Sequence, residues 1–271
     1  MRCRSMRYSV VVKTDSESAA ISELLHEKLE KINFKRDDDA PEIVISIGGD
    51  GTLLHAFSKY KSMLEKVAFI GVHTGHLGFY ADFRPHELDI LVDRLASNRI
   101  DVIDYPLLEV DLFFHDGSKD SKLALNEATL RTHDGSTLVS DVSIKENHFE
   151  RFRGDGLCIS TPSGSTAYNK SLGGALVHPS FRAMQMTEIA SINNRVFRTV
   201  GAPLILPAHH YIKMSLVNAG HYKVTVDTNH FLYDRLERIE CRVAKESVRF
   251  ARLRSLPFWQ RVHNSFIADK L

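Results

Sequence analysis

A short run of the sequence, Gly48-Gly49-Asp50-Gly51-Thr52, combines three glycines with one carboxylate. Consecutive glycines let the backbone turn tightly, so that main-chain N–H groups can approach a phosphate. The run is neither a Walker loop nor a dinucleotide fingerprint, because GxxxxGK[ST] and GxGxxG are both absent. Asp50 would repel phosphate oxygens unless it faces a metal ion or accepts the proton of a hydroxyl, which favours phosphoryl transfer. The alternative is a simple turn with Asp50 as a helix cap.

A second polar pair, Asn126-Glu127, follows the apolar segment 123–125. The amide offers a donor and an acceptor, and the carboxylate offers acceptors, which together suit the edge of an adenine or a ribose. By itself the pair favours an ordinary loop or strand end.

The stretch 151–174 is rich in glycines, hydroxyls and small residues. Small residues allow close approach of the backbone, hydroxyls and Asn169 offer directional hydrogen bonds, and Tyr168 offers a flat face for an aromatic ring. A nucleoside pocket would use all three, whereas a tight loop between strands is the alternative. Ser163 and Ser165 do not indicate a serine hydrolase, because GxSxG is absent.

Other residues are weaker candidates for a functional site. His73 and His76 have the spacing of half a metal site, but no third ligand is apparent, and no set of carboxylates is spaced like a metal cage. Phe79 and Tyr80 are candidate ring-stacking residues. Asp227, at the end of an expected strand, is as compatible with a turn as with a site.

The elements that must position these residues alternate between strand and helix in the first hundred residues. Continuous β-branched runs indicate strands that are covered on both faces, and apolar residues at helical spacing follow each of them. The pattern predicts an α/β, Rossmann-like lobe with a mostly parallel sheet, in which ligands bind at the carboxyl ends of the strands. The expected strands are 8–13, 42–47 and 67–72, and the expected helices begin near Ser16, Leu53 and Pro85.

From Ile100 onward the pattern predicts a mostly β lobe, similar to a β-sandwich. Two exceptions are a helix expected over 181–192 and a helix at the chain end, 257–271. The expected strands are 108–114, 138–144, 157–160, 211–216, 222–227, 238–243 and 248–253.

Composition excludes several classes of protein. The 271 residues are 43% hydrophobic with a net charge of +1, which gives no global field for nucleic acid or an anionic membrane. No apolar run approaches the length of a membrane helix. The three cysteines form no CxxC pair, which predicts reduced thiols. These features predict a soluble, cytoplasmic protein.

Taken together, Gly-Gly-Asp-Gly, Asn-Glu and Gly-Asp-Gly with Thr-Pro-Ser-Gly-Ser-Thr-Ala-Tyr closely resemble bacterial NAD kinases over residues 7–267. The glycine-aspartate loop alone is shared with diacylglycerol, sphingosine and 6-phosphofructo-kinases. The resemblance implies an α/β domain (1–100), a β-rich NAD-binding domain (101–254) and a C-terminal segment (255–271) that returns to the first domain.

The resemblance also implies a reaction. The γ-phosphoryl group of ATP, with Mg²⁺, would pass to the 2′-hydroxyl of the adenosine ribose of NAD, and Asp50 would be the general base. Other nucleoside triphosphates or polyphosphate stay open as donors. A homotetramer, or at least a dimer, is implied, with Ala190 near a neighbour's site. Close relatives often have His where this chain has Thr228.

The site residues implied by the resemblance fall into two sets. The donor phosphates would lie on Gly48, Gly49, Gly51 and Thr52. NAD would contact Asp50, Gly51, Phe79, Tyr80, Asn126, Glu127, Arg153, Asp155, Ser163, Thr166, Ala167, Tyr168, Asn169, Lys170, Ser171, Ala190 and Asp227.

Two other functions compete with this interpretation. A related kinase could act on a lipid or a sugar, but a lipid acceptor would require an apolar groove, and the segment 161–171 is polar. A nucleotide sensor without catalysis could use the same pocket, but such a phosphate binder would gain nothing from the anion at Asp50.

Overall fold

The computed structural model describes residues 5–75, 78–97, 100–218, 220–254 and 256–268. The chain divides into two compact units. The first comprises Met1–Tyr105 together with Ser247–Leu271, and the second comprises Pro106–Glu246. None of the described helices has the length and apolar character needed to span a lipid bilayer.

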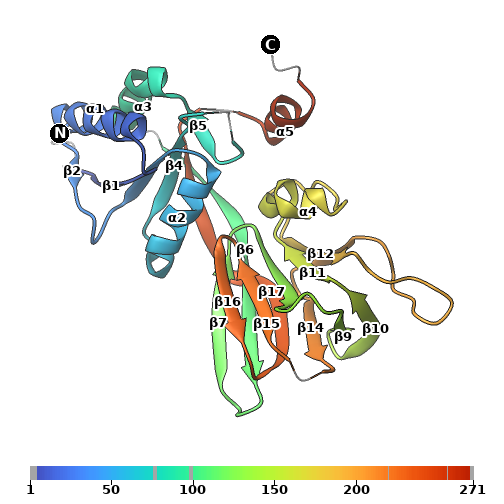
Figure 1. The fold of residues 1–271 in the computed structure, drawn as a ribbon. Coiled ribbons are helices and arrows are strands. Elements are labelled where there is room, and N and C mark those ends of the chain that lie inside the picture. The colour runs from blue at the N-terminus through green and yellow to red at the C-terminus, as the bar shows by residue number, and fades with distance from the viewer. Residues whose placement is uncertain (1–4, 76–77, 98–99, 219, 255, 269–271) are drawn as a thin grey trace. The chain divides into compact units, whose positions relative to one another are not determined.

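The first unit is built on a parallel sheet in the order β2-β1-β3-β4-β17, with β5 also paired to β4 (Figure 1). Every residue of β3 and β4 is buried, which confirms the expectation from their β-branched runs. The elements are β1 (Arg7–Val12), α1 (Ser16–Lys31), β2 (Lys35–Arg36), β3 (Ile43–Ile47), α2 (Asp50–Tyr60), η1 (Lys61–Met63), β4 (Ala68–Val72), β5 (Ala81–Phe83), η2 (Pro85–Glu87), α3 (Leu88–Ala96) and α5 (Phe258–Phe266).

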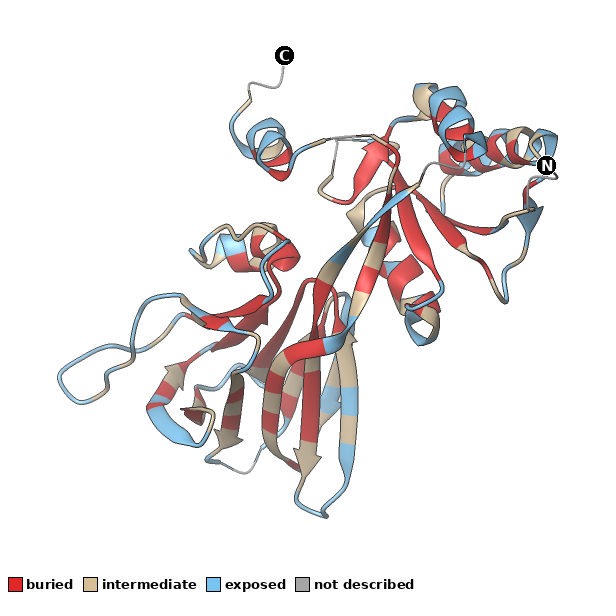
Figure 2. Ribbon diagram, turned by 180° about the vertical axis from the view of Figure 1, so that it is seen from behind, coloured by how far each residue is buried: buried red, intermediate tan, exposed pale blue. Residues whose placement is uncertain are grey.

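Helices cover both faces of this sheet, and the covered positions are buried in Figure 2. Leu25 and Leu29 of α1 pack with Leu91 and Leu95 of α3 in one core cluster, together with alternate residues of β1, β3 and β4. Residues of α2 are absent from that cluster and contact the opposite side of β1 and β3, where the Tyr60 hydroxyl donates to Ser9 Oγ at 2.7 Å. The N–H of Ser18 donates to the Asp15 carboxylate, so Asp15 caps α1.

The second unit is a sandwich of two β-sheets. One sheet has the order β10-β9-β14-β17-β6-β7, and the other has the order β13-β12-β11-β8-β15-β16. Side chains from both sheets form one core cluster, so the predicted fold class is confirmed. The strands are β6 (Asp101–Phe114), β7 (Lys119–Ala124), β8 (Glu127–Thr132), β9 (Leu138–Ile144), β10 (Asn147–Gly154), β11 (Gly156–Ser160), β12 (Ala183–Ile189), β13 (Leu204–Pro207), β14 (Tyr211–Leu216), β15 (Tyr222–Val226), β16 (Asn229–Tyr233) and β17 (Leu236–Arg252), of which β6 and β17 run through both units.

Two predictions of secondary structure are wrong. The segment 181–192 is not a helix but contains β12, which pairs with β11 and β13. Both faces of β12 are covered: Met184 and Met186 enter the core, while Gln185 exchanges two hydrogen bonds with the main chain of Ala175. The helix prediction followed the spacing of Met184, Ile189 and Ile192, although Met184-Gln185-Met186-Thr187 alternates between apolar and polar residues as a strand does. The segments 238–243 and 248–253 belong mainly to a single strand, β17, because it continues through 244–247.

Candidate active site

The glycine run lies where β3 ends and α2 begins, at the carboxyl edge of the parallel sheet (Figure 1). Gly48 has a φ of 149°, and a methyl group there would lie 2.9 Å from Lys13 Cβ and 3.0 Å from Thr52 Cβ, so only glycine fits. Gly49 is the N-cap of α2, and Asp50 is its first residue. Asp50 is therefore not the helix cap.

The carboxylate of Asp50 is held by a loop far away in sequence. The N–H of Phe79 donates to Oδ2 at 2.9 Å, and the N–H of Tyr80 donates to Oδ1 at 3.2 Å. Gly78 makes room for this group, because a methyl group on Gly78 would lie 2.6 Å from Asp50 Cγ. The side chain is only half-buried, so the carboxylate is fixed in direction and still accessible from outside.

The rings of Phe79 and Tyr80 turn into the first unit. The Tyr80 ring stacks on Phe250 with centroids 5.5 Å apart, and the Phe79 ring lies 5.3 Å from that of Phe266 and 6.4 Å from that of Phe258. Phe79 and Tyr80 contact Asp50 through their main-chain N–H groups, not through their rings. Stacking of either ring on a nucleotide stays a prediction.

A cavity of about 450 Å³ adjoins the glycine run. The N-terminus of α2 follows the carboxyl end of β3 and has no side-chain cap, so its main-chain N–H groups and positive potential lie at this edge. The N-terminus of α1 lies at the same edge but is capped by Asp15, whose carboxylate also pairs with Lys13 Nζ at 3.1 Å. The cavity can therefore hold an anion such as a phosphate chain. Its lining residues are Lys13, Asp15, Ser16, Glu17, Gly49, His73, Thr74 and Gly75.

The histidine pair gains no support as a metal site. His73 is buried, and its Nδ1 accepts the N–H of Gly75 at 2.9 Å, whereas His76 lies outside the described residues. Across the described part of the chain, no group of three or more His, Cys, Asp or Glu side chains could hold a metal ion.

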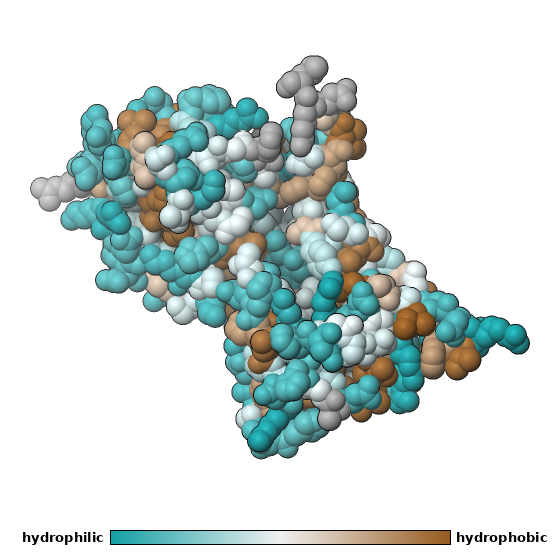
Figure 3. Space-filling model, viewed as in Figure 1, coloured by the Kyte–Doolittle hydropathy of each residue, from teal (hydrophilic) through white to brown (hydrophobic). Residues whose placement is uncertain are grey.

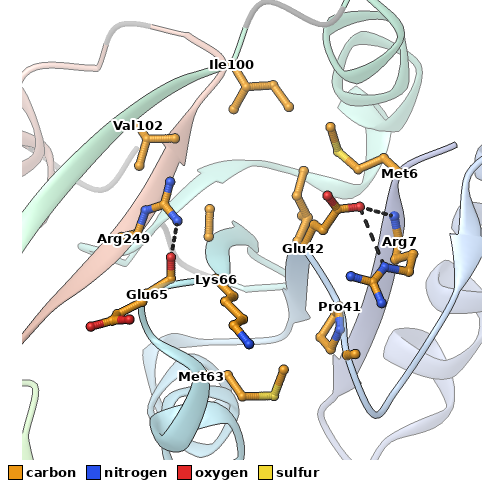
Figure 4. Close-up of a pocket in the computed structure, with 13 residues that line it drawn as sticks. Met6, Arg7, Pro41, Glu42, Met63, Glu65, Lys66, Ile100, Val102 and Arg249 are labelled. Carbon is orange, nitrogen blue, oxygen red and sulfur yellow. Dashed lines mark hydrogen bonds and ion pairs between the residues drawn. The ribbon is translucent and has the colours of Figure 1, made fainter. Parts of the chain in front are cut away.

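A larger cavity of about 670 Å³ lies near the opposite, amino ends of β3 and β4 (Figure 4). Among its charged residues, Glu42 accepts the N–H of Arg7 at 3.1 Å, and Arg249 donates to the carbonyl of Glu65 at 2.7 Å. None of the site residues expected from the sequence lines it.

In the second unit, Asp227 organises the Asn126-Glu127 pair. Its carboxylate accepts the N–H groups of Leu125, Asn126 and Glu127 at 2.9, 2.7 and 3.3 Å. The N–H of Asp227 donates in turn to the carbonyl of Glu127 at 2.9 Å. Asp227 is thus the anchor of this loop, and a direct contact from it to NAD stays a prediction.

The segment 161–171 packs against the same loop. Thr161 Oγ1 donates to the carbonyl of Leu125 at 2.6 Å and accepts the N–H of Gly164 at 2.9 Å. A methyl group on Gly164 would lie 2.6 Å from Asn126 Cα, so the two backbones approach as closely as they do only because this residue is glycine. Ser163 Oγ also donates to the carbonyl of Leu125, at 3.2 Å.

The predicted pocket residues divide by exposure into lining and supporting groups. Ser163 and Asn169 are buried, and Thr187 Oγ1 donates to Asn169 Oδ1 at 2.6 Å, so these two support the turns η3 (Ser163–Thr166) and α4 (Tyr168–Ser171) from inside. Arg131 of β8 donates a hydrogen bond to the Tyr168 hydroxyl, which holds that ring. The remaining predicted residues are partly or fully exposed: Thr166, Ala167, Tyr168, Lys170 and Ser171.

Burial strongly perturbs the two carboxyls of this region. Burial, together with the nearby Asp227, raises the pKa of Glu127 to about 8, although the N–H of Tyr168 opposes this shift. Burial also raises the pKa of Asp227 to about 6, against the lowering effect of its three N–H donors. Glu127 Oε2 is buried with no hydrogen-bond partner among the described residues. Burial therefore favours the protonated form of the Glu127 carboxyl, which can donate a hydrogen bond.

Arg153, Asp155 and Ala190 form a separate group at the ends of β10 and β12. The Arg153 guanidinium lies 4.0 Å from the centroid of the Phe197 ring. The N–H of Asp155 donates to the carbonyl of Ile189 at 3.0 Å, and Ala190 has a φ of 46° directly after β12. The carbonyl of Arg153 accepts the N–H of Ile192 at 2.8 Å.

The structure thus brings the sequence-predicted residues together in three groups: one around Asp50, one around Asn126 and one around Arg153. Sequence reasoning missed Gly78, which gives space to Asp50, and Arg131, which holds Tyr168. It also missed the contact of Arg261 with the loop that carries Phe79. No local signal marks any of them, because each acts through a partner at least 28 residues away.

Comparison with known proteins identifies relatives along nearly the whole chain. The profile of the ATP-NAD kinase N-terminal domain matches residues 4–100, and that of the ATP-NAD kinase C-terminal domain matches residues 125–253. NAD kinases of Staphylococcus aureus strains JH9 and Newman are each 56% identical over 265 residues, which is 97% of this chain and 98% of theirs.

Two solved structures share the fold. Yeast NADH kinase, determined with NADH, superimposes with a TM-score of 0.82 at 22% identity, over 98% of this chain and 88% of its own. An NAD kinase from Archaeoglobus fulgidus, determined with ATP, superimposes with a TM-score of 0.76 at 21% identity, over 96% of this chain and 97% of its own.

Proposed function

Because this chain belongs to the ATP-NAD kinase family, we propose that it phosphorylates the 2′-hydroxyl of the adenosine ribose of NAD, with ATP as the donor and Asp50 as the general base. The chain is a phosphotransferase, and NAD is its substrate. The observation that carries the role of Asp50 is its accessible carboxylate, held by two main-chain N–H groups at the start of α2.

The reaction requires three groups to be aligned. The 2′-oxygen attacks the γ-phosphorus, the bond from phosphorus to the bridging oxygen of ADP breaks, and the hydroxyl proton passes to Asp50. A carboxylate is a weak base toward a sugar hydroxyl, so the proton moves late, after the bond to ADP has lengthened. Positioning and stabilisation of charge then contribute most of the rate enhancement.

The donor phosphates are proposed to lie on Gly48, Gly49, Gly51 and Thr52, beside the cavity that Gly49 lines. The N-terminus of α2, which has no side-chain cap, favours anions there, whereas Lys13 is paired with Asp15. ATP is the proposed donor, and polyphosphate would use the same main-chain groups.

A magnesium ion fits this arrangement when it arrives on ATP. Mg²⁺ in kinases is bound by the substrate phosphates, several waters and one or two carboxylates, so it needs no cage of protein ligands. Glu17 lines the cavity and could complete its shell, whereas the Asp15 carboxylate is engaged by Ser18 and Lys13. When bound, the ion would neutralise charge on the transferred phosphoryl group.

NAD is proposed to contact the residues already named from the resemblance, with roles adjusted to the geometry. Tyr168 offers the ring for the adenine, and Asn126 and the protonated Glu127 offer hydrogen bonds to the ribose and nicotinamide side. Asp227 holds that pair in place.

Self-association is proposed through the second unit. The loop after β12 exposes large apolar residues, with Val196 78% exposed, and hydrophobic residues gather over it in Figure 3. A homotetramer, or at least a dimer, that covers this loop would bring Ala190 near a neighbour's site. We also propose that the protein is cytoplasmic.

The assay that tests the reaction follows NADP with a dehydrogenase that accepts only the 2′-phosphorylated product. We expect NADP from purified protein with NAD, ATP and Mg²⁺, and no release of ADP when NAD is replaced by diacylglycerol or fructose 6-phosphate. A folded protein that binds NAD and forms no NADP with ATP or with polyphosphate would instead be a nucleotide sensor.

A further inference from the structure

The C-terminal helix α5 is connected to the loop that holds Asp50, and both lie in the first unit. Arg261 of α5 has a side chain only 2% exposed. Its Nη1 donates to the carbonyl of Ala81 at 2.7 Å and to that of Phe79 at 3.2 Å, and its Nη2 donates to the Asp82 carboxylate. The guanidinium therefore fixes the carbonyl side of the loop whose N–H side holds Asp50.

One peptide group links Arg261 to Asp50. Its carbonyl, that of Phe79, accepts a hydrogen bond from Arg261, and its N–H, that of Tyr80, donates to Asp50 Oδ1 at 3.2 Å. Hydrogen bonds in series polarise one another, so the guanidinium strengthens the donor that holds the carboxylate. The N–H of Phe79 holds the other oxygen at 2.9 Å.

The apolar side of α5 supports the same loop. The Phe79 ring contacts the rings of Phe258 and Phe266, with centroid distances of 6.4 and 5.3 Å. A single loop residue is thus fixed at its carbonyl by Arg261 and at its ring by two other residues of α5. The helix has the contacts required to hold that loop in one position.

We propose that Arg261 is a positioning residue for phosphoryl transfer, which fixes the peptide groups that aim the Asp50 carboxylate at the ribose hydroxyl. This inference rests on the proposed role of Asp50 as the base. The competing explanation is that Arg261 only stabilises the fold through Asp82.

Asp82 allows the two explanations to be separated. Arg252 donates to both oxygens of Asp82, at 2.7 and 2.8 Å. Loss of Arg261 therefore leaves this buried carboxylate with a cationic partner, and the unit is expected to fold. Arg249 offers a matched control, because it also donates to a main-chain carbonyl, that of Glu65 at 2.7 Å, but beside the cavity at the opposite end of the strands (Figure 4).

The experiment compares Arg261→Met, Arg261→Ala, Arg261→Lys and Arg249→Met by NADP formation, by the Kd for NAD and by thermal unfolding. For Arg261→Met we expect kcat to fall about ten- to a hundredfold, with the Kd for NAD changed by less than about threefold. Arg261→Lys should recover part of the loss, because it keeps the charge but not the fork of donors. Guanidinium ion at millimolar concentration should restore part of the turnover of Arg261→Ala, in which the short side chain leaves space for the ion, and Arg249→Met should retain the parental kcat.

A parental kcat in Arg261→Met would overturn the proposal. It would also fail if Arg261→Met and Arg249→Met lost turnover in parallel with their unfolding temperatures, without rescue of Arg261→Ala by guanidinium. Asp50→Asn in the same assay distinguishes a failure of the proposed base from a failure of the proposed positioning residue. If that variant turns over normally, the role of Asp50 as base is wrong, whereas an inactive Asp50→Asn beside a normal Arg261→Met refutes only the positioning role.

Discussion

Substitution of Gly78 by alanine would displace the Asp50 carboxylate while adding a single methyl group. The new carbon would lie 2.6 Å from Asp50 Cγ, and an ordinary contact between carbons needs about 3.5 Å, so one group must move by about 1 Å. The loop is held by Arg261, and the backbone of Asp50 is held in α2, so the carboxylate side chain is the part that moves. A displacement of about 1 Å at a reacting group costs about a hundredfold in rate, or about 2.7 kcal/mol of barrier.

The assay is NADP formation at saturating ATP and Mg²⁺ with varied NAD. For Gly78→Ala we expect kcat to fall by about a hundredfold and the Kd for NAD to change little, because no other predicted NAD contact is touched. Gly220→Ala is the control, since a methyl group at that loop position has its nearest neighbour at 3.9 Å. A kcat within about threefold of the parent would refute the reasoning, because it would show that the position of this carboxylate does not limit the rate.

The remaining predictions concern the second unit. Tyr168→Ala should weaken NAD binding by roughly 1 kcal/mol, since it removes an aromatic stacking face, and calorimetric titration with NAD would show an unchanged Kd if the pocket is misassigned. Glu127→Gln should change how stability depends on pH. Because the folded pKa of Glu127, about 8, lies above its ordinary value of 4.5, the native state binds the extra proton, and stability falls as pH rises between these two values. Urea unfolding should therefore show that the parent loses free energy of unfolding, on the order of a few kcal/mol, between pH 5 and pH 9, and that Glu127→Gln loses less. Equal losses in the two proteins would contradict the argument that burial raises the pKa of Glu127.

The alternating order of the first unit could be predicted from sequence because its strands are covered on both faces and its helices are amphipathic. The runs that became β3 and β4 are wholly apolar or small, and Leu25 and Leu29 mark the buried face of α1. In the second unit the prediction failed at β12, because the helical spacing of Met184, Ile189 and Ile192 was followed instead of the alternation over residues 184–187. The polar side of that strand is buried and bonds to the main chain of Ala175, a contact that no local window records.

In the candidate site, too, local features could be predicted from the sequence and distant contacts could not. Asp50 and its glycines could be singled out because the loop, the strand end and the helix start are neighbours in sequence. The groups that orient the Asp50 carboxylate could not be predicted, since Gly78 is 28 residues away and Arg261 reaches the loop from the other end of the chain. Asp227 illustrates the same limit. Its carboxylate accepts three N–H groups about 100 residues away, and its sequence position at a strand end does not distinguish this role from that of a turn residue or a ligand.

The most direct test of the account compares Asp50→Asn with the parent, by the rate of NADP formation and by the Kd for NAD. Asparagine keeps the shape of the side chain and one of the two oxygens that accept the N–H groups of Phe79 and Tyr80, but it puts an NH2 group in place of the other oxygen and cannot take the proton of the hydroxyl. We expect NAD affinity to stay within a few-fold, while turnover falls at least about a hundredfold, as expected for the loss of a general base. Turnover that survives in Asp50→Asn, with only a raised Kd for NAD, would show that Asp50 binds the substrate and that another group accepts the proton.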